Sequence, residues 1–418
     1  MSITTEPAAA TVGRPAASVD APRGLSGVVV AQTSIGDVLG TEGRYHYRGH
    51  DAIELAREGD FERAWHLLVL GTPPDEDAAA RFRARVAALR TPPSAVREFV
   101  ERTAGARLAG DSSDSANTVG CADDNGDGGA SDTRNNADAR HLTPLRGLQA
   151  TLPVLAEALG GEPLYDLGDD DRVEQALAVG AAVPGILAAF HRAGQGLDPW
   201  PDSSDDRGAV ADYLARVTGR VPDERSIRAL SAYLIATLDH GLNASTFTAR
   251  VIASTGADLA SCIAGALGAL SGPLHGGAPS RALDALDAVA TPADIEPYLR
   301  GELSAGRRLM GFGHAVYRTA DPRSRLLRQV ALEFGGPRVE LAVQYEQTAE
   351  RLLAEYKPGR DLHTNVEFYA AVVLEQCGIP RDMFTPTFAM SRVVGWSAHV
   401  LEQARDPKII RPSSRYVP

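Results

Sequence analysis

The sequence has little cysteine and no convincing membrane span, and these shortages exclude several classes of protein. Its three cysteines, Cys121, Cys262 and Cys377, are too few and too scattered for a disulfide framework or a zinc cluster. We therefore expect a protein of the reducing cytoplasm. The best candidate for a membrane span, Leu259 to Leu274, is short and rich in Gly, Ala, Ser and Cys, which favours a tightly packed buried helix. We expect no membrane association.

Basic charge is also in deficit, because 42 Lys and Arg stand against 54 Asp and Glu and give a formal charge of −12. A chain that follows a phosphate backbone needs the opposite balance, so we predict no nucleic-acid partner. The 418 residues are 44% hydrophobic, which is ample for a core, and the length suggests roughly two or three domains.

Two segments offer little to bury. Residues 1–23 are rich in Ala, Pro, Thr and Ser, lack the pattern of a secretory signal, and are predicted to be a disordered tail. Residues 110–140 are acidic and rich in Gly, Ser and Asn, and are predicted to be a flexible surface insertion. Within them, residues 123–128 match the first half of a calcium-binding EF-hand loop, but Arg134 stands where the bidentate Glu is needed. We favour a solvated loop.

The remaining pattern is helical after a small β element. Val28 to Val30, Thr33 and Ile35, with turn residues at Gly36, Gly40 and Gly43, predict short strands. Strand-like runs are almost absent afterwards, so the fold class is mostly α. Helices are expected at about 53–70, 76–90, 93–108, 143–160, 171–193, 206–219, 223–239, 245–270, 280–288, 292–304, 322–334, 337–355, 364–377 and 386–404.

Four segments place a His, Arg or carboxylate in turns rich in small residues or at the start of a helix. Small residues beside a His let a ligand approach the backbone closely, and loops between rigid helices commonly carry catalytic groups. These segments are Asp239 to Thr246, Gly272 to Ala278, Gly311 to Arg323, and Asn365 to Tyr369.

Together these segments resemble the citrate synthase family. The Gly-Phe-Gly-His…Asp-Pro-Arg segment (311–323) is highly specific, and His-Gly-Gly-Ala (275–278) and Asn-Val-carboxylate (365–367) occur in the family's order. The resemblance runs from Gly24 to Tyr416 and includes an Arg-Pro-x-x-x-Tyr ending. It implies a two-domain helical fold with a large domain over 24–277, a small domain over 278–383, and a return to the large domain over 384–418.

The chemistry of that family joins a thioester to an α-keto diacid, oxaloacetate. A carboxylate removes a weakly acidic α-proton, and the enolate must be stabilised as it forms. By resemblance, Glu367 is the base, His275 stabilises the enol(ate), and His314 donates to the ketone of the acceptor. No metal and no further cofactor is implied, since the acyl-CoA is itself a substrate.

The resemblance also implies binding residues. Arginine suits oxaloacetate because its planar fork meets a carboxylate bidentately. A homodimer is implied in which Arg411 comes from the partner subunit. The implied oxaloacetate residues are His240, Asn243, Arg323, Arg392 and Arg411, and the implied coenzyme A residues are Arg318, Lys357 and Arg360.

One departure concerns the base, because the family residue at position 367 is Asp and this chain has Glu. The extra methylene displaces the carboxylate by about one bond, and a misplaced base can cost on the order of a hundredfold in rate. Either the backbone compensates, or the chain is a weakly active paralogue that binds coenzyme A and oxaloacetate. Acetyl-CoA, giving citrate, and propionyl-CoA, giving 2-methylcitrate, both stay open, because one methylene is worth only about 1–3 kcal/mol.

Two other classes of function could also use these residues. A metal-dependent hydrolase would use His240, His275, His314 and Glu367 as ligands, but their spacing is unlike helical metal motifs and nearby Arg would repel a cation. A non-catalytic binding protein of the same fold has only Glu367 in its favour. We expect the remaining histidines, among them His399 in Gly395-Trp396-Ser397-Ala398-His399, to be ordinary surface or core residues.

Overall fold

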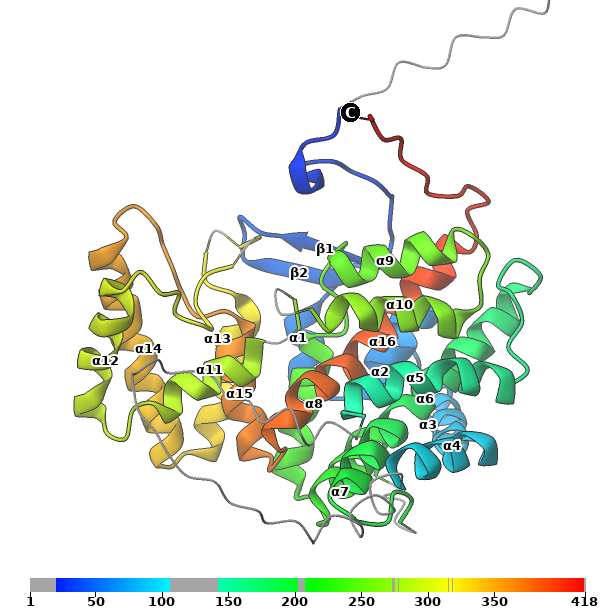
Figure 1. Ribbon diagram of the computed structural model, residues 1–418, viewed down its shortest axis with the longest axis horizontal. Coiled ribbons are helices and arrows are strands. Elements are labelled where there is room, and N and C mark those ends of the chain that lie inside the picture. Colours follow the sequence, from blue (N-terminus) through cyan, green and yellow to red (C-terminus); the bar gives the residue numbers. More distant parts are fainter. Residues whose placement is uncertain are drawn as a thin grey trace, which may run out of the picture.

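The computed structural model describes residues 20–105, 142–201, 207–272, 275–276, 278–314, 316–317 and 319–416. Regular structure within these ranges is overwhelmingly helical (Figure 1), which confirms the mostly α fold class. The predicted acidic insertion and nearly all of the predicted tail lie outside the described residues.

The small β element exists, but it begins later than predicted. Its three antiparallel strands, in the order β1-β2-β3, are β1 (Gly36–Leu39), β2 (Arg44–Tyr47) and β3 (His50–Asp51). The prediction of a strand at 28–30 is wrong, because these residues pair with no strand and Val29 is 86% exposed. β-branched residues favour a strand only where a sheet face can be buried, and here the buried side chains are Tyr45 and Tyr47 of β2.

Two long helices expected from the sequence are each broken in the structure. The first breaks at Gly59, which adopts φ +73°, and Asp60 then caps the next helix through the amide of Arg63. The second breaks at Gly256, with φ +78°, and Asp258 caps the following helix through the amide of Ser261. In both places a glycine ends one helix and an Asp starts the next.

The other predicted helices occur close to their expected positions. A short 3-10 helix, η1 (Arg23–Leu25), precedes the strands, and another, η2 (Arg381–Met383), precedes the last helix. The α-helices are α1 (Ala52–Glu58), α2 (Phe61–Leu70), α3 (Glu76–Leu89), α4 (Ser94–Gly105), α5 (Pro144–Ala158), α6 (Asp169–Gly194), α7 (Ala209–Thr218), α8 (Glu224–Ala236), α9 (Ala244–Ala253), α10 (Leu259–Leu270), α11 (Ala278–Asp287), α12 (Pro292–Ser304), α13 (Pro322–Phe334), α14 (Pro337–Tyr356), α15 (Val366–Gln376) and α16 (Phe384–Gln403).

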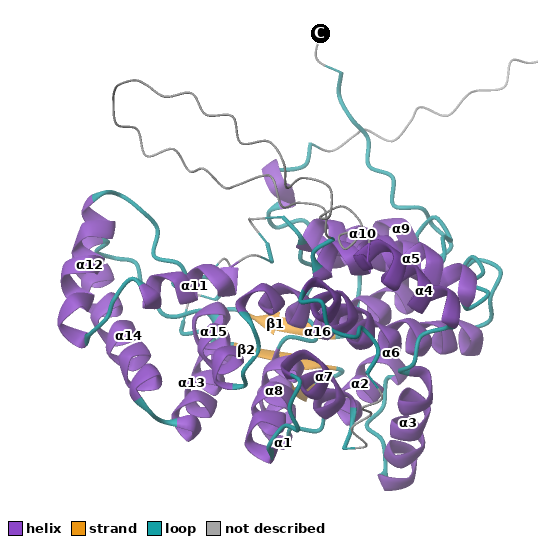
Figure 2. Ribbon diagram, turned by 60° about the horizontal axis from the view of Figure 1, so that its bottom comes forward, coloured by secondary structure: helices purple, strands orange, loops and turns teal. Residues whose placement is uncertain are grey.

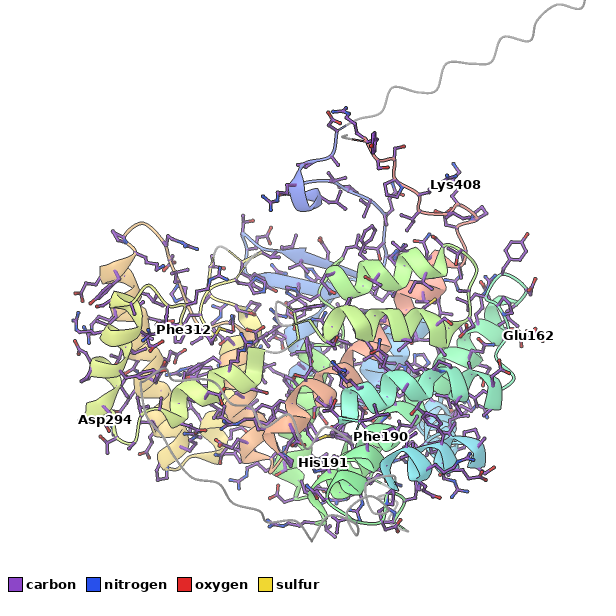
Figure 3. The ribbon with its side chains drawn as sticks, in the orientation of Figure 1. Glu162, Phe190, His191, Asp294, Phe312 and Lys408 are labelled. Carbon is purple, nitrogen blue, oxygen red and sulfur yellow. The ribbon has the colours of Figure 1, made fainter. Side chains whose placement is uncertain are left out.

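The core is centred on α6 and α16, which pack against each other and against several other helices. Small residues permit this packing, because a Cβ at Gly180 of α6 would lie 2.6 Å from the Trp65 ring. Among the described helices, α6 alone is long and apolar enough to cross a membrane, but 83% of its most apolar window is buried inside the protein. Phe190 and His191 of α6 lie in this interior, whereas Asp294 lies at the far end of the molecule (Figure 3).

Helices α11–α14 gather at one end of the molecule in both ribbon views (Figures 1 and 2). They belong to the segment predicted as the small domain, 278–383, whose boundaries stay a prediction. α13 and α15 pack on each other and both contact α8, so the segment is joined to the rest of the protein through α8. Several of the predicted site residues, among them Arg323, Glu367 and Arg392, lie on the helices α13, α15 and α16 that meet there.

The two chain ends run away from the helices. After α16, residues 405–416 form an extended, mostly exposed segment that carries Lys408 (Figure 3) and ends near Asp20, at the start of the described residues (Figure 1). Arg415 forms an ion pair with Asp20 at 2.8 Å, and the amide of Ile410 donates to Ser254 Oγ at 3.0 Å. These contacts hold the terminal segment against the β-element side of the molecule.

Candidate active site

Helix N-termini position three of the predicted site residues. Asn243 caps α9 by accepting from the amide of Thr246, and Asp321 and Asn365 cap α13 and α15 in the same way. Arg323 and Glu367 therefore lie in the first turns of α13 and α15. The exposed amides and the dipole of a helix N-terminus make it favourable for anions. Two of these helices, α13 and α15, pack against each other.

His275 is held by a hydroxyl that the sequence analysis did not single out. Ser245 Oγ lies 2.8 Å from His275 Nε2 and 2.8 Å from Asn243 Oδ1, and Trp396 Nε1 donates to the same oxygen at 3.2 Å. A hydroxyl has one proton, and Ser245 donates it to Asn243 Oδ1, which can only accept, so His275 Nε2 carries the ring proton and donates to Ser245 Oγ. Burial, and then the charge of Arg392, lower the pKa of His275, which keeps the ring neutral.

His314 is also neutral, and its tautomer is fixed. Its Nδ1 accepts from the amides of Val316 at 3.0 Å and Tyr317 at 3.1 Å, so the ring proton is on Nε2. Burial and the nearby Arg323 guanidinium lower the pKa of His314 to about 4. Arg323 Nη2 lies 3.1 Å from His314 Nε2. Two N–H donors thus face the same point, which favours an acceptor oxygen from a ligand there.

His240 lies against this pair. Its Nε2 is 3.0 Å from the hydroxyl of Tyr317, and its ring centroid is 5.4 Å from that of His314. Burial and the charges of Arg323 and Arg392 push the pKa of His240 well below its usual range. The structure therefore brings His240, His314 and Arg323 together, as predicted, and adds Tyr317 to them.

The two predicted substrate arginines differ in how their charge is balanced. Arg323 is 2% exposed and pairs with Asp321 through two N–H···O contacts, Nε at 3.0 Å and Nη2 at 2.8 Å. Arg392 is 4% exposed and donates from Nε to the Thr237 carbonyl at 2.8 Å, while its guanidinium lies 4.7 Å from the centre of the Phe388 ring. Its Nη1 is buried without a hydrogen-bond partner in the described part of the chain. A buried cationic donor without an acceptor is suited to an anionic ligand.

Glu367 is a half-buried residue whose carboxyl lies in a poorly solvated environment. Burial, opposed by Arg323 and Asn365 and aided by the charge of Asp321, raises the pKa of this carboxyl to about 7. A carboxylate with a pKa near neutrality is a much stronger base than one near 4, and about half of it is still ionised at neutral pH. The environment thus corrects the weakness expected for an ordinary carboxylate.

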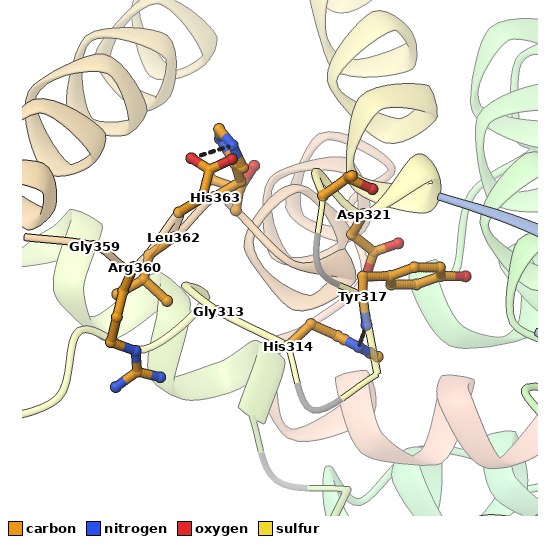
Figure 4. A pocket seen from close by; sticks show the side chains of 11 residues that line it. Gly313, His314, Tyr317, Asp321, Gly359, Arg360, Leu362 and His363 are labelled. Atoms are coloured by element: carbon orange, nitrogen blue, oxygen red, sulfur yellow. Dashed lines mark hydrogen bonds and ion pairs between the residues drawn. The ribbon is translucent and has the colours of Figure 1, made fainter. Parts of the chain in front are cut away.

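A cleft of about 320 Å³ opens beside His314. The segment with His314 and Tyr317 lines one side and the segment from Gly359 to Thr364 lines the other (Figure 4). Arg360 is in this lining, as expected for a coenzyme A residue. Lys357, also predicted for coenzyme A, is an exposed residue at the end of α14 and is not in the lining.

Two further predictions stand apart from this cluster. Arg318 lies outside the described residues. Arg411 is exposed on the extended C-terminal segment, next to Ile410, and the structure does not bring it to the site of its own chain. Ser245 and Tyr317, in contrast, belong to the site and were within the segments singled out in the sequence. The sequence signal for Ser245 is its position two residues after Asn243, and the signal for Tyr317 is its position three residues after His314.

Metal-binding geometry is not found in the described ranges, where no group of three or more His, Cys, Asp or Glu side chains is close enough to hold an ion. The residues proposed above for a metal-dependent hydrolase therefore do not converge as ligands. The EF-hand-like residues 123–134 lie outside the described residues.

The comparisons with known sequences and with known structures agree on one family. Residues 24–159 and 131–413 match the family model described as "Citrate synthase, C-terminal domain". The "Putative citrate synthase 2" of Mycobacterium tuberculosis is 46% identical over 272 residues, which cover 65% of this chain and 72% of the relative. The 2-methylcitrate synthase of Shewanella oneidensis is 31% identical over 398 residues, 94% of each chain. The solved citrate synthase of Thermotoga maritima superposes with a TM-score of 0.74 at 31% identity, over 94% of both chains.

Proposed function

The chain belongs to the citrate synthase family and is an acyltransferase of that type, and we propose that it condenses acetyl-CoA with oxaloacetate and water to give citrate and coenzyme A. This is the condensing step of the tricarboxylic acid cycle. The observation that carries the proposal is a carboxyl of pKa about 7, Glu367, within electrostatic reach of the same Arg323 that acts on the neutral His314, together with a second neutral histidine, His275.

Glu367 is proposed to take the α-proton of the thioester. The raised pKa of Glu367 differs less from the high pKa of the thioester α-carbon, so the proton transfer requires less free energy. The longer side chain of Glu relative to Asp is compatible with this role, since α15 begins at Val366 and fixes the backbone one residue before the base. The weakly active paralogue is therefore the less favoured alternative.

His275 is proposed to stabilise the enol(ate) oxygen. Because Ser245 donates to Asn243 Oδ1, the proton of the neutral ring is on Nε2, and this Nε2–H is the donor that would be offered to the enol(ate) oxygen. A neutral donor is well matched to an enolate that carries a partial charge and is formed in a poorly solvated site. Asn243 supports this arrangement from the cap of α9, where it fixes the position of Ser245.

The acceptor is proposed to bind where the donors converge. The ketone oxygen of oxaloacetate would accept from His314 Nε2 and Arg323 Nη2, which now face each other at 3.1 Å. A carboxylate of the acceptor would accept from Arg392 Nη1, and His240 would border the same pocket. The enolate carbon then attacks the polarised ketone, and water hydrolyses the resulting thioester to release coenzyme A.

Three features of the assembly complete the proposal. Arg360, with Lys357 and Arg318, would meet the phosphates of coenzyme A, and the 278–383 segment would close on the rest of the protein to exclude water. A homodimer would supply Arg411 to the site of the partner subunit, and the exposed extended segment 405–416 supports such a contribution. The buried free thiols of Cys262 and Cys377 are compatible with the reducing cytoplasm as the compartment.

The alternative substrate is propionyl-CoA, which would give 2-methylcitrate, and a curated relative of that name covers nearly the whole chain. The test is oxaloacetate-dependent release of free coenzyme A thiol from acetyl-CoA and from propionyl-CoA, each with and without EDTA. We expect EDTA-insensitive release that is faster with acetyl-CoA. Faster release from propionyl-CoA would establish the alternative, and release abolished by EDTA would contradict a metal-free synthase.

No release from either thioester would point to the binding paralogue. Replacing Glu367 with Asp would then separate two causes. Activity that appears in the Asp variant would identify a mis-set base, whereas continued inactivity with retained oxaloacetate binding would identify a non-catalytic protein.

A further inference from the structure

A row of buried polar side chains extends behind the proposed oxaloacetate pocket. His399 of α16 is fully buried, and its Nε2 lies 3.1 Å from Asp239 Oδ1. On its other side, Nδ1 lies 2.9 Å from Arg250 Nη1, which also donates to Glu402 Oε2 at 2.6 Å. The row thus joins a carboxylate beside the pocket, Asp239, to an ion pair near the surface.

The direction of these hydrogen bonds is determined by chemistry. An arginine guanidinium has only donors and keeps its proton, so Arg250 must donate and His399 Nδ1 must accept. The proton of the neutral imidazole is then on Nε2, and His399 donates to Asp239. His399 is therefore an oriented donor and is more than a packing residue.

Asp239 is held between His399 and Arg392. His399 and Arg392 are seven positions apart on α16 and so lie on the same face of that helix. Gly395 lies between them, and a Cβ there would be 2.1 Å from the Leu238 carbonyl oxygen and 3.3 Å from Asp239 Cβ. The backbone at 238–239 is therefore pressed against α16 between the two side chains.

The second oxygen of Asp239 is occupied as well. Oδ2 accepts from the amide of Gly241 at 3.1 Å, which holds the turn that carries His240. Burial lowers the pKa of Arg392, and the charge of the nearby Asp239 opposes this lowering, yet no ion pair within 4.0 Å joins these two described residues. Arg392 Nη1 consequently remains without a partner although a carboxylate is close by.

We propose that His399 is a positioning residue for oxaloacetate: by holding Asp239 Oδ1, it keeps this carboxylate from pairing with Arg392, whose Nη1 then stays available to the substrate. The proposal rests on the proposed function and names a role for a residue that does not touch the substrate. Without the His399 donor, Asp239 would turn toward the unpaired guanidinium and compete with the substrate carboxylate.

Two polar substitutions separate this role from a purely structural one. In His399→Asn, the amide oxygen can still accept from Arg250, but the side chain is too short to reach Asp239. In His399→Gln, the amide nitrogen extends about as far as the imidazole Nε2 and can donate to Asp239. His191→Asn is the matched control, because His191 is 3% exposed and its ring contacts Gln195 and Asp382 instead of the proposed site residues.

The measurement is calorimetric binding of oxaloacetate to each purified variant, with the KM for acyl-CoA and the melting temperature alongside. We expect His399→Asn to weaken oxaloacetate binding about tenfold and to change the KM for acyl-CoA less than about twofold. His399→Gln should stay within about threefold of the unmodified protein, and His191→Asn should lower only the melting temperature. Adding Asp239→Asn to His399→Asn should strengthen oxaloacetate binding, because a neutral amide cannot compete for Arg392.

Equal binding by the Asn and Gln variants would overturn the proposal, as would loss of binding in His191→Asn to the same degree. A double variant that binds more weakly than His399→Asn would also overturn it. Since every comparison is made to the unmodified protein, a chain that binds oxaloacetate without releasing thiol would contradict the proposed function and leave this test intact.

Discussion

The two sides of the proposed site are built in different ways. The oxaloacetate side is formed by buried groups after α8, in the first turn of α13 and on α16, where Arg323 and Arg392 are almost entirely enclosed. The acyl-CoA side is a cleft lined by short segments, including Gly313 and Gly359, whose φ values of +81° and +83° suit glycine. The donors of the oxaloacetate side are fixed by helices and hydrogen bonds, whereas the lining of the acyl-CoA side is formed by loops.

This difference indicates that the oxaloacetate side is organised before the substrate binds, whereas the acyl-CoA side adjusts to its substrate. A small dicarboxylate offers few contacts, so its donors have to be oriented before it binds. Coenzyme A is large and can be held by exposed charges such as Arg360 while the loops adjust. We therefore expect substitutions on the buried side to have larger effects than those on the open side.

The largest effect is expected at Glu367. Glu367→Gln removes the base while keeping the size of the side chain, and should lower kcat by about a thousandfold. Oxaloacetate binding should remain within about threefold, because Arg323, Arg392 and His314 are unchanged. Glu367→Asp is the control that keeps an ionisable group. More than a tenth of the original kcat in the Gln variant would show that another group takes the proton.

On the buried side, Arg392→Gln should weaken oxaloacetate binding about a hundredfold, measured by calorimetry. The estimate follows from the loss of a buried charge that is proposed to meet a substrate carboxylate. The KM for acyl-CoA should change much less. If both substrates lost affinity equally, Arg392 would be needed for the fold of α16 more than for the acceptor.

The partner subunit can be tested by complementation. Arg411→Ala should weaken oxaloacetate binding about tenfold, since one exposed cation would be lost from the pocket. Mixed dimers of Arg411→Ala with Glu367→Gln should then regain one intact site in two, because Glu367 and Arg411 would come from different subunits. Mixed dimers no more active than the parents would refute the shared site.

The smallest effect is expected on the open side. Arg360→Gln should raise the KM for acyl-CoA about three- to tenfold, in a salt-dependent manner, because exposed ion pairs contribute little and are screened. Arg405→Gln, an exposed cation outside the cleft, serves as the control. A weakened affinity for oxaloacetate in Arg360→Gln would erase the distinction between the two sides.

Much of this organisation could be predicted from the sequence, and the exceptions have physical causes. Helical periodicity located most helices. A new helix that starts at a capping residue, as at Asp60 and Asp258, cannot be recognised from periodicity alone, because the apolar pattern continues across the break. Val28 to Val30 look like a strand because side-chain preference cannot show whether a sheet face is present to bury them.

Within the site, motifs identified the residues but not their relations. Nothing in the spacing of His314 and Arg323 shows that their N–H groups face each other, since this depends on the turn at Val316 and Tyr317. The raised pKa of Glu367 likewise comes from burial, which only the folded chain provides. For the same reason His399 looked like an ordinary core residue until its contact with Asp239 was known.

The most direct test of the account is the pH dependence of kcat/KM for acyl-CoA. The pKa of His314 is about 4, and those of His240 and His275 are also lowered, so these rings remain neutral; of the groups proposed to act in the reaction, Glu367, with its pKa of about 7, is the one that should titrate near neutrality. A base must be ionised, and a raised pKa means that this form is lost as the pH falls through about 7. We predict that kcat/KM decreases tenfold per pH unit below about pH 7 and is level above it. A profile that stays level down to pH 5 would contradict Glu367 as a base tuned by burial.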